Sequence, residues 1–135
     1  MTDTAAQIQM FLDSQDAAEA LDPDKAAHHY AEDAVFEFPF APDGFPSKLE
    51  GRGQILEFFR QFPKYYKTVR FLDRTITPLA DGAGLIAEYR GEWINIKDRP
   101  YNNTYIIVVR FRGDKVVHVR EFFNPLVWLE SLKPG

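Results

Sequence analysis

One carboxyl group stands out in the chain, because Glu121 falls in a strand-like segment that also carries several large apolar residues. Successive side chains of a β-strand point to opposite faces, so Glu121 is expected to share a face with Val117, Val119 and Phe123. An apolar environment disfavours the charged form of a carboxyl group and raises its pKa toward neutrality. Such a group can accept and donate protons near pH 7. Glu121 is therefore the candidate acid–base residue.

A structural role for Glu121 is the alternative. Arg90 and Arg110 stand in segments expected to form neighbouring strands, and an ion pair with either of them would stabilise the charged carboxylate. A glutamate that reaches bulk water would also keep its ordinary pKa. In either case the residue would contribute to stability or solubility and not to proton transfer.

A second group of side chains alternates along segments 85–96 and 101–112, on faces that can turn toward a common interior. Its members are Tyr89, Trp93, Asn95, Asn103 and Tyr105. Tyrosine and asparagine can orient a carbonyl or carboxylate group, and tryptophan can stack on a ring. Gly91, in the middle of the first segment, leaves room for a ligand or permits a bend in the sheet. The alternative is an aromatic core whose polar tips are satisfied locally.

Hydrophobic spacing predicts the elements that position these side chains. Helices are expected at residues 4–21, from Pro23, at 52–62 and from Pro125. Strands are expected at residues 34–40, 68–78, 85–96, 101–112 and 115–123, with a tight turn at 113–114 and a long loop at 41–51. Helices that come first and antiparallel strands that come last indicate an α+β fold, in which the helices pack on one face of a curved sheet.

Composition narrows the possible partners. The 135 residues suit one domain, 1–135, and the 12 Phe, 6 Tyr and 2 Trp indicate either an aromatic core or a cavity walled by rings. A net charge of −4 without a basic run argues against nucleic-acid binding, and no segment is long and apolar enough to suit a membrane. The absence of cysteine and of a secretion signal favours a cytoplasmic protein.

Motifs that hold cofactors or metals are missing from the sequence. There is no phosphate-binding loop and no glycine pattern typical of dinucleotide binding, so no cofactor is expected. His28 and Glu32 are one helical turn apart, a spacing that metal sites use. No third ligand stands at a matching spacing, and we therefore expect a solvated helix face and no metal site.

Short motifs spread over the chain resemble the SnoaL-like, ketosteroid-isomerase-like superfamily. In the first half they occupy residues 30–39, 51–55 and 58–61. The second half is more similar to the phenazine-biosynthesis A/B proteins, at Tyr101, Asn103, Tyr105, Phe111, Gly113, Lys115, Val116, Arg120 to Phe122, Asn124, Leu129 and Leu132. The resemblance covers about residues 5–132. It implies the nuclear transport factor 2-like fold, in which helices and a strongly bent, mixed, mostly antiparallel sheet form a cone around a deep pocket.

The resemblance also implies roles for single residues. Glu121 matches the acid–base glutamate in the Arg-Glu-Phe motif of the phenazine-type proteins, whereas their partner histidine is replaced here by Phe58. The general base of ketosteroid isomerase falls on Phe38, its oxyanion-hole aspartate falls on Ile107, and its tyrosine falls near Ser14. These departures argue against ketosteroid isomerisation by that mechanism and predict a less polar wall opposite Glu121.

Two functions fit these observations. The first is a cofactor-independent enzyme that uses proton transfer for isomerisation, cyclisation, dehydration or acid-assisted condensation of an apolar cyclic molecule. Its catalytic residue would be Glu121, and its substrate-binding residues would be Tyr105, Asn103, Tyr89, Trp93, Asn95, Phe38, Phe58 and Phe123. The second is a ligand-binding or dimerisation module without catalysis. The superfamily further implies a homodimer through the outer sheet face, which would carry His118, Arg120 and Phe122.

Overall fold

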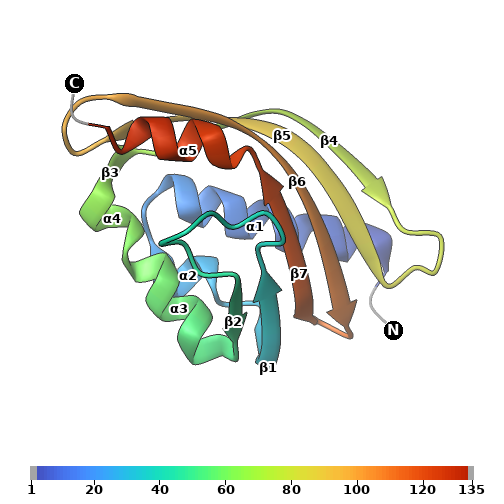
Figure 1. Cartoon of the computed structure of the whole chain (residues 1–135). Helices are drawn as coiled ribbons and strands as arrows, with labels where there is room; N and C mark the ends of the chain where they lie inside the picture. Colours follow the sequence, from blue (N-terminus) through green and yellow to red (C-terminus); the bar gives the residue numbers. More distant parts are fainter. Residues whose placement is uncertain (1–2, 134–135) are drawn as a thin grey trace.

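The computed structural model describes residues 3–133, so the first two and the last two residues of the expected domain 1–135 lie outside the described residues (Figure 1). The helices are α1 (Thr4–Glu19), α2 (Pro23–Ala26), α3 (Arg52–Arg60), α4 (Phe62–Tyr65) and α5 (Pro125–Ser131). The strands are β1 (Tyr30–Glu37), β2 (Lys48–Glu50), β3 (Tyr66–Thr68), β4 (Phe71–Pro78), β5 (Gly84–Asn95), β6 (Pro100–Arg112) and β7 (Lys115–Phe123). Within this span, every helix is too short or too polar to cross a membrane.

The strands form a single mixed sheet in the order β2-β1-β7-β6-β5-β3, and β4 also pairs with β5. The β1–β7 pair is parallel, and the other pairs are antiparallel. The sheet curls, helices α1 to α4 lie on its concave side, and α5 lies against β6 (Figure 1). The α+β class and the bent, mostly antiparallel sheet are therefore confirmed.

Local capping explains where three of the helices begin. The side chain of Asp3 accepts a hydrogen bond from the Ala6 N–H at the start of α1. Asp22 and Asn124 cap α2 and α5 in the same way, and each is followed by a proline in the first turn. Because both the cap and the proline are visible in the sequence, the starts of these two helices were predictable.

Two expected strands have different bounds. The strand expected at 34–40 begins earlier, at Tyr30, and ends before Pro39, which has no N–H to donate to a sheet. The strand expected at 68–78 is divided into β3 and β4, which pair with separate parts of β5. At the break Val69 is buried, so the chain gains a core contact where it leaves the hydrogen-bonded ladder.

One short strand and one helix boundary were missed. Strand β2 lies inside the loop expected at 41–51, and only its middle residue, Leu49, is buried. Three residues are too few for an alternation to be recognised, and β2 is defined by its pairing with β1. The helix expected at 52–62 ends at Arg60, and α4 follows it, because Pro63 has no N–H with which to continue α3.

The β6–β7 hairpin sets the direction in which Glu121 points. Its register places Ile107 opposite Glu121, and nearer the turn it places Phe111 opposite Val116. A shift in the pairing leaves one extra residue in β7, which is a β-bulge. The expectation that Val117 shares the face of Glu121 is therefore wrong. Val116 is buried on that face, and Val117 is only half-buried.

Candidate active site

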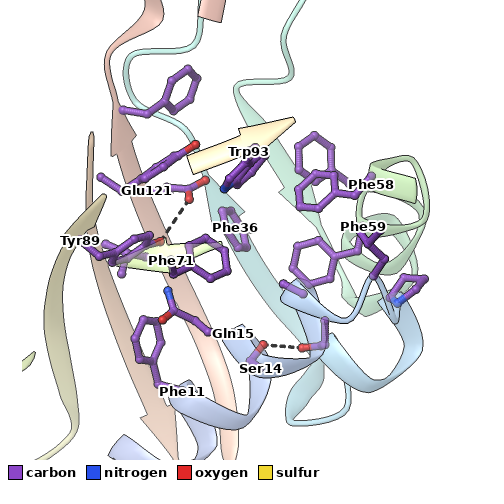
Figure 2. A pocket seen from close by; sticks show the side chains of 18 of the residues that line it. Phe11, Ser14, Gln15, Phe36, Phe58, Phe59, Phe71, Tyr89, Trp93 and Glu121 are labelled. Atoms are coloured by element: carbon purple, nitrogen blue, oxygen red, sulfur yellow. Dashed lines mark hydrogen bonds between the residues drawn. The ribbon is translucent and has the colours of Figure 1, made fainter. Parts of the chain in front are cut away.

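The concave face of the sheet and the helices that cover it enclose a cavity of about 140 Å³ (Figure 2). Most of its walls are rings contributed by both layers, among them Phe11, Phe36, Phe58, Phe59, Phe71 and Tyr89. A few polar groups interrupt this aromatic lining, and Glu121 is one of them. The cavity therefore combines an apolar interior with isolated polar atoms, the composition typical of a small-molecule site.

Glu121 projects from the inner face of β7, and its carboxyl group points into the cavity (Figure 2). The Tyr89 hydroxyl donates a long hydrogen bond of 3.5 Å to Glu121 Oε1. The chain surrounds Glu121 on all sides, yet part of its side-chain surface remains accessible. This accessible part faces the cavity, so the residue counts as half-buried. Removal from bulk water raises the pKa of Glu121 to about 7, and the hydrogen bond from Tyr89 opposes this rise only in part.

The arginines considered as ion-pair partners of Glu121 are engaged elsewhere. Arg90 Nε lies 2.7 Å from Asp73 Oδ2, and Arg110 Nη1 lies 3.0 Å from Asp81 Oδ2. Both arginines are on the outer face of the sheet, where their side chains are exposed. The alternative in which Glu121 serves as half of an ion pair with one of them is therefore wrong.

A buried glutamine supports the Tyr89 hydroxyl. Gln15 of α1 lies close enough to the Tyr89 hydroxyl to lower its pKa, and its Oε1 accepts a hydrogen bond of 3.1 Å from Arg74 Nη1. With that oxygen engaged, the amide nitrogen of Gln15 faces the tyrosine. Burial, together with the nearby Glu121, raises the pKa of Tyr89 well above its ordinary value, so Tyr89 remains a proton donor at neutral pH. This arrangement fixes the direction from which Glu121 is hydrogen-bonded.

Six of the nine expected site residues line the cavity. They come from α3 and from the inner faces of β5, β6 and β7, and they are Glu121, Tyr89, Trp93, Tyr105, Phe58 and Phe123. The hydroxyl groups of Tyr105 and Tyr101 are hydrogen-bonded to each other. Strand alternation therefore placed five of these six residues around the cavity, and α3 contributes the sixth, Phe58. The other three expected residues are described next.

Asn103 is buried on the inner face, but it is not part of the cavity wall. Its Nδ2 donates to Tyr101 Oη at 2.7 Å and to the Asn124 carbonyl at 3.0 Å, and its Oδ1 accepts from the Asn124 N–H at 3.1 Å. These bonds tie β6 to the junction of β7 and α5. The expectation that Asn103 binds substrate is corrected, because its side-chain polar atoms are already occupied.

Asn95 and Phe38 also lie outside the cavity wall. Asn95 Oδ1 accepts hydrogen bonds from the N–H groups of Lys97 at 2.9 Å and Arg99 at 3.1 Å, which closes the turn between β5 and β6. Phe38 is 1% exposed and packs behind the wall, with its ring centroid 5.3 Å from that of Phe58. Both residues stabilise the structure around the cavity instead of contacting its contents.

Sequence reasoning missed several polar residues of the wall, among them Gln15 and Tyr30. Gln15 stands one helical turn after Phe11, so a polar residue in line with the apolar stripe was the available signal. Tyr30 lies before the strand expected at 34–40, whereas it begins β1, and its ring stacks on Phe36 with centroids 6.4 Å apart. Among residues 3–133, no three His, Asp or Glu side chains are grouped so that they could hold a metal ion.

The raised pKa of Glu121 predicts a pH dependence of stability. The carboxyl group titrates near 4.5 when unperturbed and at about 7 in the folded protein. Between these values the folded chain binds more protons than the unfolded chain, so the free energy of unfolding falls as the pH rises from 4.5 to 7 and then levels off. The full loss is roughly 3 kcal/mol.

Urea unfolding of the wild type and of Glu121→Gln across this pH range measures the effect. Other groups, such as His29, titrate in both proteins, so the difference between the two curves isolates Glu121. We expect the difference in unfolding free energy between the two proteins to change by most of the roughly 3 kcal/mol between about pH 5 and about pH 8. Parallel curves would show that the carboxyl group has an ordinary pKa.

In this fold a carboxylic acid lies in an aromatic cavity between the helices and a curled mixed sheet. The arrangement is typical of a class of α+β proteins whose chemistry depends on the residues that line the cavity. The model of the SnoaL-like domain matches residues 9–119, and the chain belongs to this family. The PhzA/B-like protein PA3332 of Pseudomonas aeruginosa, itself uncharacterised, is 37% identical over 101 residues, which are 74% of this chain and 71% of that protein.

Solved structures agree with this assignment. A Bacillus subtilis protein provisionally named an isomerase superposes with a TM-score of 0.89 at 30% identity, covering 96% of this chain and 94% of the other. A nuclear transport factor 2-like protein of unknown function from Burkholderia pseudomallei gives a TM-score of 0.80 at 16% identity, covering 99% of this chain and 100% of the other. The second likeness shows the fold alone.

Proposed function

We propose that this chain is an enzyme that transfers protons on a small, apolar, cyclic molecule, with Glu121 as the acid–base residue. The observation that carries the proposal is the carboxyl group of Glu121 inside an aromatic cavity, with a pKa of about 7. At neutral pH both forms of such a group are populated, so it can remove a proton and return it without a second residue. The provisional name of the Bacillus subtilis relative, an isomerase, supports this reaction class.

The proposed step begins with the carboxylate form of Glu121. It removes a proton from a carbon next to a carbonyl group of the substrate, and the electron pair of the broken C–H bond moves to the carbonyl oxygen as an enolate forms. The resulting carboxylic acid then returns the proton to a carbon or to the oxygen of the same molecule. Tyr89, itself held by Gln15, keeps the Glu121 carboxyl group in one orientation during both transfers.

The test measures proton exchange directly. Cyclohexanone is incubated in deuterium oxide with the protein, and loss of its α-hydrogen signals is followed by proton NMR. We expect exchange faster than in buffer, and a rate that rises with pH through an apparent pKa of about 7 as the carboxylate forms. Exchange no faster than in buffer, for this and other single-ring ketones, would contradict the proposal.

A ligand-binding module without catalysis is the second candidate. It is favoured by Phe58, which places a ring in the cavity wall where the phenazine-type proteins carry a histidine, so the wall opposite Glu121 is less polar. The same NMR samples separate the two functions. Binding of the ketone without accelerated exchange would support the module, whereas accelerated exchange supports the enzyme.

We also propose that two copies pair through the outer face of the sheet. This face is free of helices α1 to α4, and Ile106 is 43% exposed on it beside the half-buried Phe122 (Figure 1). Arg120 and Glu88 add exposed charges of both signs, so a second copy related by a two-fold axis can present complementary groups.

Analytical ultracentrifugation tests the pairing. The wild type is expected to sediment with twice the mass of one chain, and Ile106→Glu is expected to shift it to one chain, because a carboxylate buried in the interface beside its cross-strand neighbour Glu88 would lack a partner. Ala5→Glu, at an exposed position of α1 away from the outer face of the sheet, controls for added charge. A wild-type protein that sediments as a single chain at about 100 μM would contradict the proposal.

A further inference from the structure

The indole nitrogen of Trp93 is a buried donor without an acceptor. Trp93 lines the cavity and is 7% exposed, and within residues 3–133 no acceptor lies in hydrogen-bonding position to its Nε1. The atom has almost no accessible surface, even toward the cavity, so a ligand acceptor can reach it only when the indole shifts off Gly91. Buried donors in folded proteins are nearly always paired, and an unpaired one carries the full cost of its lost hydration. A ligand acceptor that reached this nitrogen would remove that cost.

The local backbone fixes the position of this nitrogen. A Cβ atom on Gly91 would lie 2.8 Å from Trp93 Nε1 and 3.0 Å from Tyr105 Cε2. The room left by Gly91 is thus used by the indole, which leans along β5 over this glycine and lies nearly parallel to the Tyr105 ring, with centroids 6.0 Å apart. The nitrogen edge of Trp93 is turned to the side of the cavity where Glu121 stands (Figure 2).

The cavity volume limits the size of the ligand. At about 140 Å³ it is close to the engineered apolar cavity of about 150 Å³ that binds benzene. A single six-membered ring fits such a space, whereas a second fused ring would have to project through the open side of the cavity or push the walls apart. The walls are closely packed rings. The ring centroids of Phe62 and Tyr66, for example, lie 5.7 Å and 4.8 Å from that of Trp93, so expansion of the cavity would disturb several contacts.

We infer that the cavity takes a single-ring apolar molecule with one oxygen acceptor, such as a cyclic ketone, and that the Trp93 N–H donates a hydrogen bond to this oxygen while Glu121 faces the adjacent carbon. The inference rests on the proposed function and names its substrate class. In the proposed proton transfer, negative charge develops on the carbonyl oxygen, and the indole N–H is a donor with no other partner to give up. Trp93 then favours ligands that carry an oxygen acceptor, and the size of the cavity favours ligands with a single ring.

Binding measurements by NMR test this without requiring turnover. The protein has 2 Trp, and the other, Trp128, also lines the cavity but is hydrogen-bonded to Tyr66. In ¹⁵N-labelled protein each indole N–H gives its own resonance, and Trp128→Phe assigns them. Cyclohexanone is expected to shift the Trp93 resonance downfield, whereas methylenecyclohexane, which replaces the oxygen by a CH₂ group, is not.

The variant Trp93→Phe keeps a ring in place but removes the donor. We expect the wild type to bind cyclohexanone roughly three- to tenfold more tightly than the variant does, with methylenecyclohexane affected much less. A fused bicyclic ketone, decalone, is expected to bind more weakly than cyclohexanone to the wild type.

Two results would overturn the inference: a Trp93 resonance that does not respond to the ketone, or an unchanged preference for ketone in the variant. If instead the ketone binds through Trp93 but its hydrogens do not exchange, the inference stands and the proposed catalysis fails. Circular dichroism of Trp93→Phe confirms that the variant is folded before its binding is compared.

Discussion

Replacing Glu121 with glutamine is expected to lower the catalysed exchange of ketone α-hydrogens by about 10²- to 10⁴-fold. The amide has nearly the shape of the carboxylic acid and can still face Tyr89, but it cannot accept a proton from carbon. The cavity and its aromatic walls remain, so binding of cyclohexanone should change far less than the exchange rate. The initial rate of deuterium incorporation under saturating ketone, compared with the dissociation constant from NMR titration, separates the two effects.

Glu88→Gln is the matched control for this variant. Glu88 is an exposed glutamate on the outer face of β5, so the same chemical change there leaves the cavity untouched. Its exchange rate should equal that of the wild type. If Glu121→Gln retained the wild-type rate while bound to ketone, a different group would have to move the proton, and the proposed enzyme mechanism would be wrong.

Truncation of Phe38 to alanine is expected to destabilise the protein by about 3–5 kcal/mol, the cost typical of removing a buried phenylalanine. Phe38 is 1% exposed, and its ring centroid lies 4.8 Å from that of Phe36 and 4.9 Å from that of Phe45. These neighbours belong to β1 and to the loop beside it, so little of the space can close by itself. Urea unfolding at constant pH measures the loss as a lower midpoint with an unchanged slope.

Phe40→Ala provides the comparison, because Phe40 is two residues away but 60% exposed. Its ring contacts Phe122 on the surface at a centroid distance of 5.4 Å, so its removal should cost less than about 1 kcal/mol. Equal effects of the two truncations would mean that Phe38 is not part of the core. Unaltered stability of Phe38→Ala, with altered ketone binding, would restore its expected role as a substrate contact.

Much of the architecture was predictable because it depends on local patterns. Strand β7 has the bounds that were expected, and β6 begins only one residue earlier than expected. Each strand alternates its apolar residues, and Gly113 supplies the positive φ of 60° that the tight turn between them requires. Asn124, just before α5, and Pro125, at its first position, likewise mark the start of this helix by a local pattern.

The candidate acid was predictable for the same reason. Alternation assigns Glu121 to a face, and the apolar residues in line with it indicate that this face is buried. The bulge at Val117 did not change that outcome, because it lies closer to the hairpin turn than Glu121 does. Every residue from Val119 onward keeps the alternation that the sequence displays.

Tertiary structure alone decided what the inward-facing polar groups do. Asn103 and Tyr105 stand on one face of one strand. The side chain of Asn103 is nevertheless hydrogen-bonded to the backbone of Asn124, while Tyr105 lines the cavity. The partner of Tyr89 comes from a helix more than 70 residues earlier in the chain, at Gln15. Alternation is a property of neighbouring residues, so it can assign a side chain to a face. Which groups then meet across the cavity depends on how distant segments pack, and nothing in the local pattern encodes that.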